Sequence, residues 1–196
     1  MRTLFALAAL ALAAGCTTPA YVSPVEVTRF AAAAPGEFGR GAIAVRAAPG
    51  QVPNAWDFAA YQRAVAGELQ ELGYTIDESA RQVAEIRVDR AVAREGSGRR
   101  SPVSVGVGGS TGSYGSGVGM GVGINLGGNR ASEQIDTQLQ VMIRPEAGDN
   151  ALWEGRARFS ATANSQFADQ RAAAGKLADA LFSGFPGRSG ETIEVQ

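Results

Sequence analysis

Hydrophobic and polar positions follow two different periods along the chain after residue 24. A period of two, which is typical of a β-strand with one buried face, recurs in five segments. These predicted strands cover residues 25–30, 41–47, 83–94, 135–144 and 153–161. In the last two strands, apolar side chains share one face and charged or polar side chains share the other, so the sequence predicts an antiparallel hairpin with one solvated face.

Two segments have the period of an amphipathic helix instead. The first begins after Asn54, a predicted N-cap, and ends at Gly73; its apolar stripe is Phe58, Tyr61, Val65, Leu69 and Leu72. The second begins near Ser165 and is stopped by Pro186; its apolar side is Ala174, Leu177, Leu181 and Phe185. Both stripes are narrow, which predicts helices that bury one side only.

From residue 41 onward, the order strand, helix, strand, strand, strand, helix predicts an α/β (α+β) two-layer sandwich. Both helices are expected on one face of a mixed, mostly antiparallel sheet, with the first helix as the crossover between two parallel strands. The predicted core places Trp153 and Phe159 beneath the helices, beside Leu69, Leu72, Leu177 and Leu181. Residues 25–186 form this single domain, and residues 187–196 are predicted to be a flexible tail.

A glycine-rich insert separates the middle strands. Residues 101–129 include 11 glycines, and no charged residue occurs between Arg100 and Arg130. Glycine costs about 1 kcal/mol relative to alanine in a helix, and valines alternate with small residues here, so the sequence predicts a hairpin. The candidate contacts of its apolar face with a partner or a membrane are Val105, Val107, Met120, Val122 and Ile124.

The first residues have the pattern of an export signal. An uncharged apolar run from Leu4 to Cys16 follows a single cation, Arg2. A signal peptide needs about 7–15 apolar residues and a membrane-spanning helix needs about 20, so this run predicts export. Residues 13–16, Ala-Ala-Gly-Cys, resemble a bacterial lipobox.

The lipobox resemblance implies an anchor at Cys16. Residues 1–15 would be removed as a signal peptide, acyl chains such as palmitate would be attached at Cys16, and residues 16–24 would be an extended tether. Several acyl chains hold a protein at a membrane more firmly than one. Thr17, in place of an aspartate, resembles the outer-membrane default of such lipoproteins, which implies a protein anchored in the outer membrane and facing the periplasm.

Composition narrows the chemistry. The 196 residues include no histidine and one cysteine, and the formal net charge is −1. Without histidine the chain lacks the commonest general base and metal ligand, and the charge predicts no nucleic-acid partner. The segment 108–112, Gly-Gly-Ser-Thr-Gly, matches a nucleophile elbow, but that motif needs a strand before it, a helix after it and a histidine. The sequence predicts no catalytic residue, no cofactor and no metal site.

Three short motifs resemble one bacterial lipoprotein family. They are Leu72-Gly73-Tyr74 after the first helix, Leu152-Trp153-Glu154-Gly155 in a late strand, and Phe185-Pro186 after the last helix. Together with the glycine-rich insert they are similar to the domain-of-unknown-function 4136 family. The resemblance implies the two-layer fold and the lipid anchor, and it implies no active site. Residues 39–47 depart from the aromatic-rich first strand of many members.

The sequence therefore predicts a non-enzymatic envelope lipoprotein whose sheet or insert binds an unknown envelope protein or lipid. A second hypothesis is a homo-oligomer that places the hairpins of the insert in the outer membrane, because a single hairpin would leave its edges unpaired in lipid. The alternative for the insert, without membrane insertion, is a flexible glycine loop or a hairpin packed on a neighbouring protein. An enzyme that uses carboxylates alone is the third hypothesis. Arg99 and Arg100 are interpreted as solvated cations or as contacts with lipid phosphates.

Overall fold

A computed structural model describes most of the domain. The described residues are 19–32, 38, 40–51, 55–93, 105–106, 121–122, 133–148 and 150–196. The larger sheet has the strand order β3-β2-β4-β7-β8-β1-β9, and β5 and β6 form a separate pair. The strands are β1 Val25–Ala31, β2 Ala42–Ala47, β3 Thr75–Ile76, β4 Gln82–Ala93, β5 Val105–Gly106, β6 Gly121–Val122, β7 Gln134–Pro145, β8 Trp153–Thr162 and β9 Glu191–Val195. The helices are α2 Ala55–Glu71, the short η3 Gln166–Ala168 and α3 Gln170–Phe182.

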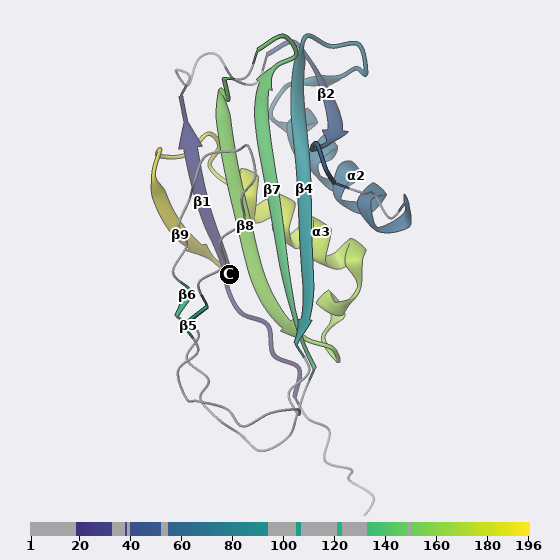
Figure 1. Cartoon of the computed structure of the whole chain (residues 1–196), viewed down its shortest axis with the longest axis vertical. Coiled ribbons are helices and arrows are strands. Elements are labelled where there is room, and N and C mark those ends of the chain that lie inside the picture. The colour runs from purple at the N-terminus through teal and green to yellow at the C-terminus, as the bar shows by residue number, and fades with distance from the viewer. Residues whose placement is uncertain are drawn as a thin grey trace, which may run out of the picture.

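Both long helices cover the same face of the sheet, and no helix of the described residues lies on the opposite face (Figure 1). The predicted two-layer α/β sandwich is therefore confirmed. The strands on either side of α2, β2 and β4, pair in parallel, as expected for a crossover helix, whereas β4, β7, β8 and β1 pair antiparallel. None of the helices in the described ranges is long and apolar enough to cross a membrane.

The end of α2 shows why the chain stops being helical where the sequence predicts. The amide N–H of Gly73 donates to the carbonyl oxygen of Gln70, and that of Tyr74 donates to Leu69, both at 3.0 Å. This pair of bonds is a Schellman motif, and it requires the positive φ of 99° that Gly73 adopts. Tyr74 folds back into the core and is buried. The predicted cap, Asn54, lies outside the described residues.

The core lies between the sheet and the helices. Trp153, Phe159, Leu69, Leu177 and Leu181 are all buried as predicted, and Leu72 packs against them while partly exposed. The Trp153 ring stacks on Phe182 with a centroid distance of 5.5 Å, and its Nε1 donates to the Pro186 carbonyl oxygen at 2.9 Å. The polar atom of the largest buried ring is therefore satisfied, which removes the usual cost of burying an indole.

The last helix begins and ends within the predicted segment. Ser165 caps the short helix η3, since its side chain accepts a hydrogen bond from the Phe167 amide. Asp169 caps α3 by accepting from the amides of Arg171 and Ala172. The predicted start near Ser165 is therefore the start of η3, and Asp169 begins α3 as a second cap. The predicted extension to Phe185 is wrong, because α3 stops at Phe182.

The C-terminal segment corrects a second prediction. The sequence predicts a flexible tail at residues 187–196, but residues 191–195 form β9, which pairs antiparallel with β1. The turn before β9 closes over Arg29, because the Gly190 amide donates to the Arg29 carbonyl oxygen at 2.8 Å. Without β9 the backbone groups on that side of β1 would lack strand partners, so pairing satisfies an edge that local pattern does not reveal.

Arg29 itself joins this turn to α3. Its guanidinium is buried and donates to the carbonyl oxygens of Leu181 and Ala180 at 3.0 and 2.9 Å. A cation at a helix C-terminus is favourable, because unpaired carbonyls gather there. Burial lowers the pKa of Arg29, and nearby Glu191 acts in the opposite direction. The Cβ of any larger residue at Gly187 would lie 2.8 Å from the Arg29 side chain.

The predicted tether, residues 16–24, ends earlier than expected. Val22 bridges to Ala161, and the Ser23 amide donates to the Ser160 carbonyl oxygen at 2.8 Å. The Tyr21 amide donates to the Thr162 hydroxyl at 2.9 Å. Residues 21–24 therefore continue along β8 beyond the start of β1, because the end of β8 offers unpaired backbone groups.

Within the insert the structure describes two short strands. Val105 pairs with Val122 and Gly106 pairs with Gly121 in the antiparallel ladder of β5 and β6. This pairing confirms a hairpin between the two predicted arms at these positions. Val107, Met120 and Ile124 lie outside the described residues.

Candidate functional site

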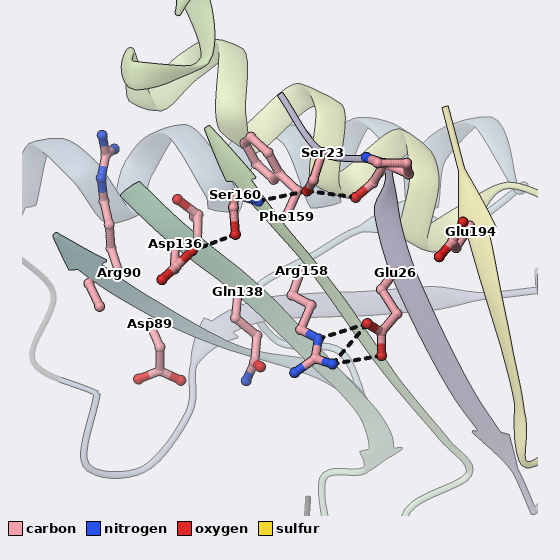
Figure 2. A pocket seen from close by; sticks show the side chains of 13 residues that line it. Ser23, Glu26, Asp89, Arg90, Asp136, Gln138, Arg158, Phe159, Ser160 and Glu194 are labelled. Atoms are coloured by element: carbon pink, nitrogen blue, oxygen red, sulfur yellow. Dashed lines mark hydrogen bonds and ion pairs between the residues drawn. The ribbon is translucent and has the colours of Figure 1, made fainter. Parts of the chain in front are cut away.

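The face of the sheet away from the helices carries the candidate site. We call the end of the sheet where β4 stops at Ala93 and β7 starts at Gln134 the insert end, and the opposite end the far end. Because side chains alternate across a strand, every second residue of β4, β7, β8 and β1 points to this uncovered face. Figure 2 shows Glu26, Asp89, Gln138 and Arg158 on this side of the sheet.

A polar trough of about 840 Å³ crosses the uncovered face. Its floor is one row of neighbouring residues on five strands, from β9 to β4: Glu194, Glu26, Arg158, Gln138 and Asp89. Adjacent strands lie about 4.8 Å apart, so the row is about 19 Å long. Toward the insert end the trough is also lined by Ser23, Pro24, Ala91, Asp136 and Ser160.

Arg158 is the cation at the centre of this row. Its Nη2 donates to both carboxylate oxygens of Glu26, at 2.9 and 2.8 Å, and its Nε donates to Oε2 at 3.2 Å. The side chains remain 54% and 41% exposed. A solvated pair of this kind contributes only about 0.2–1 kcal/mol to stability. The pair therefore holds a guanidinium in a defined position at the surface without strongly stabilising the fold.

A second polar group lies beside the row, toward the insert end. The Ser160 hydroxyl donates to Asp136, and the Ser160 amide donates to the Ser23 hydroxyl at 2.9 Å (Figure 2). Asp89 and Glu194, at the two ends of the row, make no ion pair with any part of the chain that the structure describes. The trough therefore offers a central guanidinium flanked by carboxylates, hydroxyls and one amide.

The part of the uncovered face near the far end is closed by its own side chains. Arg144 Nη2 lies 2.6 Å from Glu85 Oε1, and the Glu85 side chain is only 7% exposed. Glu154 Oε1 accepts from Arg156 at 2.7 Å and from Gln140 at 3.0 Å. These groups satisfy one another, so a ligand would have to break existing bonds there. Among the described residues, the trough half of this face is the more open one.

Across the described ranges, no group of three or more acidic, cysteine or histidine residues is placed to hold a metal ion. Ser160 is paired with a carboxylate, and the sequence has no histidine to take its proton. The Gly-Gly-Ser-Thr-Gly segment, 108–112, lies outside the described residues. What the trough can do chemically is bind polar and charged groups through hydrogen bonds and ion pairs.

The structure brings together only part of the site predicted from sequence. Val105 and Val122 lie opposite each other in the β5–β6 ladder. Cys16 and the other candidate contacts of the insert lie outside the described residues. The sequence does not predict the trough, although its alternation places the charged side chains of residues 153–161 on a solvated face. The missing signal was the lateral register, which alone makes Glu26, Arg158 and Asp89 neighbours.

Comparisons with known proteins give no family for the chain. No protein-family model matches it. A protein of Zymomonas mobilis subsp. mobilis, described as uncharacterized, is 38% identical over 69 residues, which are 35% of this chain and 26% of that protein. The chain thus spans about a quarter of that relative's length.

Two solved structures show distant similarity. A PelC dodecamer from Paraburkholderia phytofirmans is 12% identical, with a TM-score of 0.42 over 87% of this chain and 100% of the PelC chain. A PDZ domain protein from Parabacteroides distasonis is 12% identical, with a TM-score of 0.45 over 89% of this chain and 38% of that protein. Both proteins are distant structural neighbours of this chain.

Proposed function

We propose that this protein is a non-enzymatic lipoprotein of the bacterial envelope that binds another envelope component through the trough on its uncovered sheet face. The trough is the observation that carries this proposal. It is open, polar and about 840 Å³ in volume, whereas the rest of the same face is closed by its own ion pairs. Lipid at Cys16 would anchor the protein in the outer membrane, facing the periplasm.

The chemistry of the trough indicates what kind of partner it would accept. Arg158 is held at the surface by one carboxylate, so its remaining donors are available to an anionic or carbonyl group of a partner. Asp89 and Glu194, about 19 Å apart across the row, are available to cations or hydrogen-bond donors. An extended partner with alternating polar groups, such as a peptide segment of an envelope protein, satisfies both requirements.

A site-specific cross-linking experiment tests the binding proposal. A photoreactive amino acid replaces Gln138 in the middle of the trough, and the matched control replaces exposed Gln70 on α2. In intact cells we expect one discrete cross-linked product from position 138 and none from position 70. Arg158→Glu should remove the product from position 138. Identical products at both positions, or a product unaffected by Arg158→Glu, would contradict the proposal.

A labelling experiment tests the anchor separately. A clickable fatty acid should be incorporated into the wild-type protein and not into Cys16→Ser, because Cys16 is the single cysteine of the chain. Equal labelling of both proteins, or a mature form that begins at another residue, would contradict the anchor.

The second candidate function is an oligomer that places the hairpin of the insert in the outer membrane. The pairing of Val105 with Val122 favours it, because hairpin strands could complete a barrel with those of other subunits. Single cysteines at Val105 and Val122, probed with a membrane-impermeant maleimide, separate the two functions. Full labelling in intact outer membranes would exclude insertion, whereas protection of both, with labelling at Ser113, would support it.

A further inference from the structure

The insert end of the sheet has an unusual surface. Across the described part of the chain, the large hydrophobic side chains that are exposed are Tyr21, Phe30 and Val92, at 55%, 48% and 53%. Across the strands, Val92 lies in one row with Ile135, Ala161 and Val22. Tyr21 lies one row further outward, where its amide donates a hydrogen bond to the Thr162 hydroxyl. Two of these three side chains therefore lie within the last two rows of the insert end.

The exposure of Val92 has a simple structural cause. The alternation of β4 places Val92 on the same side as buried Ile86, so the sequence predicts it to be covered by a helix. Further along the same side, Arg90 donates to the Ala168 carbonyl oxygen at the end of η3. Val92 lies beyond that contact, and burial of β4 decreases toward its end at Ala93. The helical layer is shorter than the strand, so an apolar residue is left at the insert end.

The chain leaves the domain at this same end. Tyr21 is five residues after Cys16, and an extended segment of five residues spans at most about 17 Å. A lipid on Cys16 would therefore keep Tyr21 within about 17 Å of the bilayer surface. Phe30 lies toward the far end, in the same lateral row as Glu154, Met142 and Glu85. Along β4, Glu85 is seven residues before Val92. At about 3.3 Å per residue, Phe30 lies about 23 Å further from the insert end.

We infer that the insert end of the sheet rests on the lipid bilayer, with Tyr21 and Val92 in contact with the headgroup region and with the strands standing away from the membrane. This inference rests on the proposed lipidation of Cys16. A tyrosine at the end of an element is suited to a membrane interface, because its ring is apolar and its hydroxyl is polar. The trough begins just behind this surface, at Ala91, Asp136 and Ser160, so it would open sideways into the periplasm.

The two ends of the sheet differ in the way that this orientation requires. At the insert end the row of Val92 contains no charged residue. At the far end, the row that contains Phe30 also contains Glu154 and Glu85 and lies next to Arg144 and Arg156. Contact of the far end with lipid would bring several charges toward the hydrocarbon, which is unfavourable. The row of Val92 itself brings no charge toward the hydrocarbon; Asp136 lies in the next row inward, and Glu133 directly precedes β7.

Fluorescence quenching in vesicles tests the inference. Full-length lipoprotein with a single added cysteine at Val92, Tyr21, Phe30 or Gln70 is labelled with a polarity-sensitive fluorophore, because the thiol of Cys16 is consumed by lipid. Each protein is reconstituted in vesicles of phosphatidylethanolamine and phosphatidylglycerol containing doxyl-labelled lipid. We expect a blue shift and loss of emission at positions 92 and 21, and neither at positions 30 and 70. Circular dichroism checks that each labelled variant is folded.

The outcomes separate this inference from the proposed anchor. Flotation of the protein with the vesicles reports the anchor, and the position of quenching reports the orientation. Flotation with equal quenching at 92 and 30, with quenching at 70, or with none at 92 and 21 would overturn the orientation alone. Failure to float would overturn the anchor and the orientation together. A second measurement is the double variant Tyr21→Ser, Val92→Ser, which should float but lose quenching of a label at Ala93.

Discussion

The close approach of Trp153 to Gly155 gives the sharpest test of how the core is packed. Both residues belong to the inward row of β8, and the indole ring lies over Gly155. A Cβ on Gly155 would overlap Trp153 Cη2 and would lie 2.8 Å from Leu181 Cδ1. Real Cβ atoms do not approach this closely, so Gly155→Ala must displace a fully buried ring or the α3 helix.

The expected cost follows from that clash. Inserting a methyl group into a packed core costs about 1–3 kcal/mol, and the two displaced groups are both buried here, which favours the upper part of this range. For a domain of this size each kcal/mol lowers the Tm by about 2–4 °C. We therefore expect Gly155→Ala to lower the Tm by roughly 4–12 °C. Thermal unfolding followed by far-UV circular dichroism measures this change.

A matched control and a double-mutant cycle isolate the cause. A Cβ on Gly175, in the middle of α3, would meet nothing within 4 Å, so Gly175→Ala should raise stability by up to about 1 kcal/mol. Trp153→Phe removes the atoms that Gly155→Ala would strike. In the Trp153→Phe background, Gly155→Ala should cost at least about 1 kcal/mol less than in the wild type. Equal costs in both backgrounds, or equal effects at Gly155 and Gly175, would refute the packing argument.

Three further changes have expected outcomes in the same unfolding assay. Trp153→Ala should cost about 3–5 kcal/mol because the ring is fully buried, and a change near zero would show that the ring is exposed. Arg29→Met should cost about 2–3 kcal/mol, because the Ala180 and Leu181 carbonyl oxygens lose their donor; a loss below about 0.5 kcal/mol would show that water replaces it. Burial, with Asp179 and Glu71 nearby, raises the pKa of Glu68 in the folded protein. Ionisation of Glu68 therefore opposes folding at a pH above that pKa, and this penalty disappears as the pH falls below the pKa of Glu68 in the unfolded chain. Glu68→Gln should therefore stabilise the protein at pH 7, by no more than about 0.5 kcal/mol because solvent screens the group, and a gain that persists unchanged at low pH would contradict this cause.

The sequence by itself determined the elements whose signals are local. Strict alternation located β1, β2, β4, β7 and β8, because a strand with one buried face must alternate. Gly73 marked the end of α2, because the Schellman turn needs a residue that accepts positive φ. The apolar stripes of the two helices and the apolar faces of the strands also predicted that the helices cover the apolar face of the sheet. In each case the information lies within a few consecutive residues.

The tertiary structure decided the features that depend on distant partners. β9 forms because β1 has an edge to be paired and because Arg29 holds the turn against α3, and neither condition is visible in residues 187–196 alone. The trough exists because the register of five strands aligns Arg158 with Glu26 and Asp89. Val92 is exposed because α3 and η3 end before β4 does. Alternation specifies which face a side chain occupies, but the register between strands and the reach of the helical layer specify its neighbours.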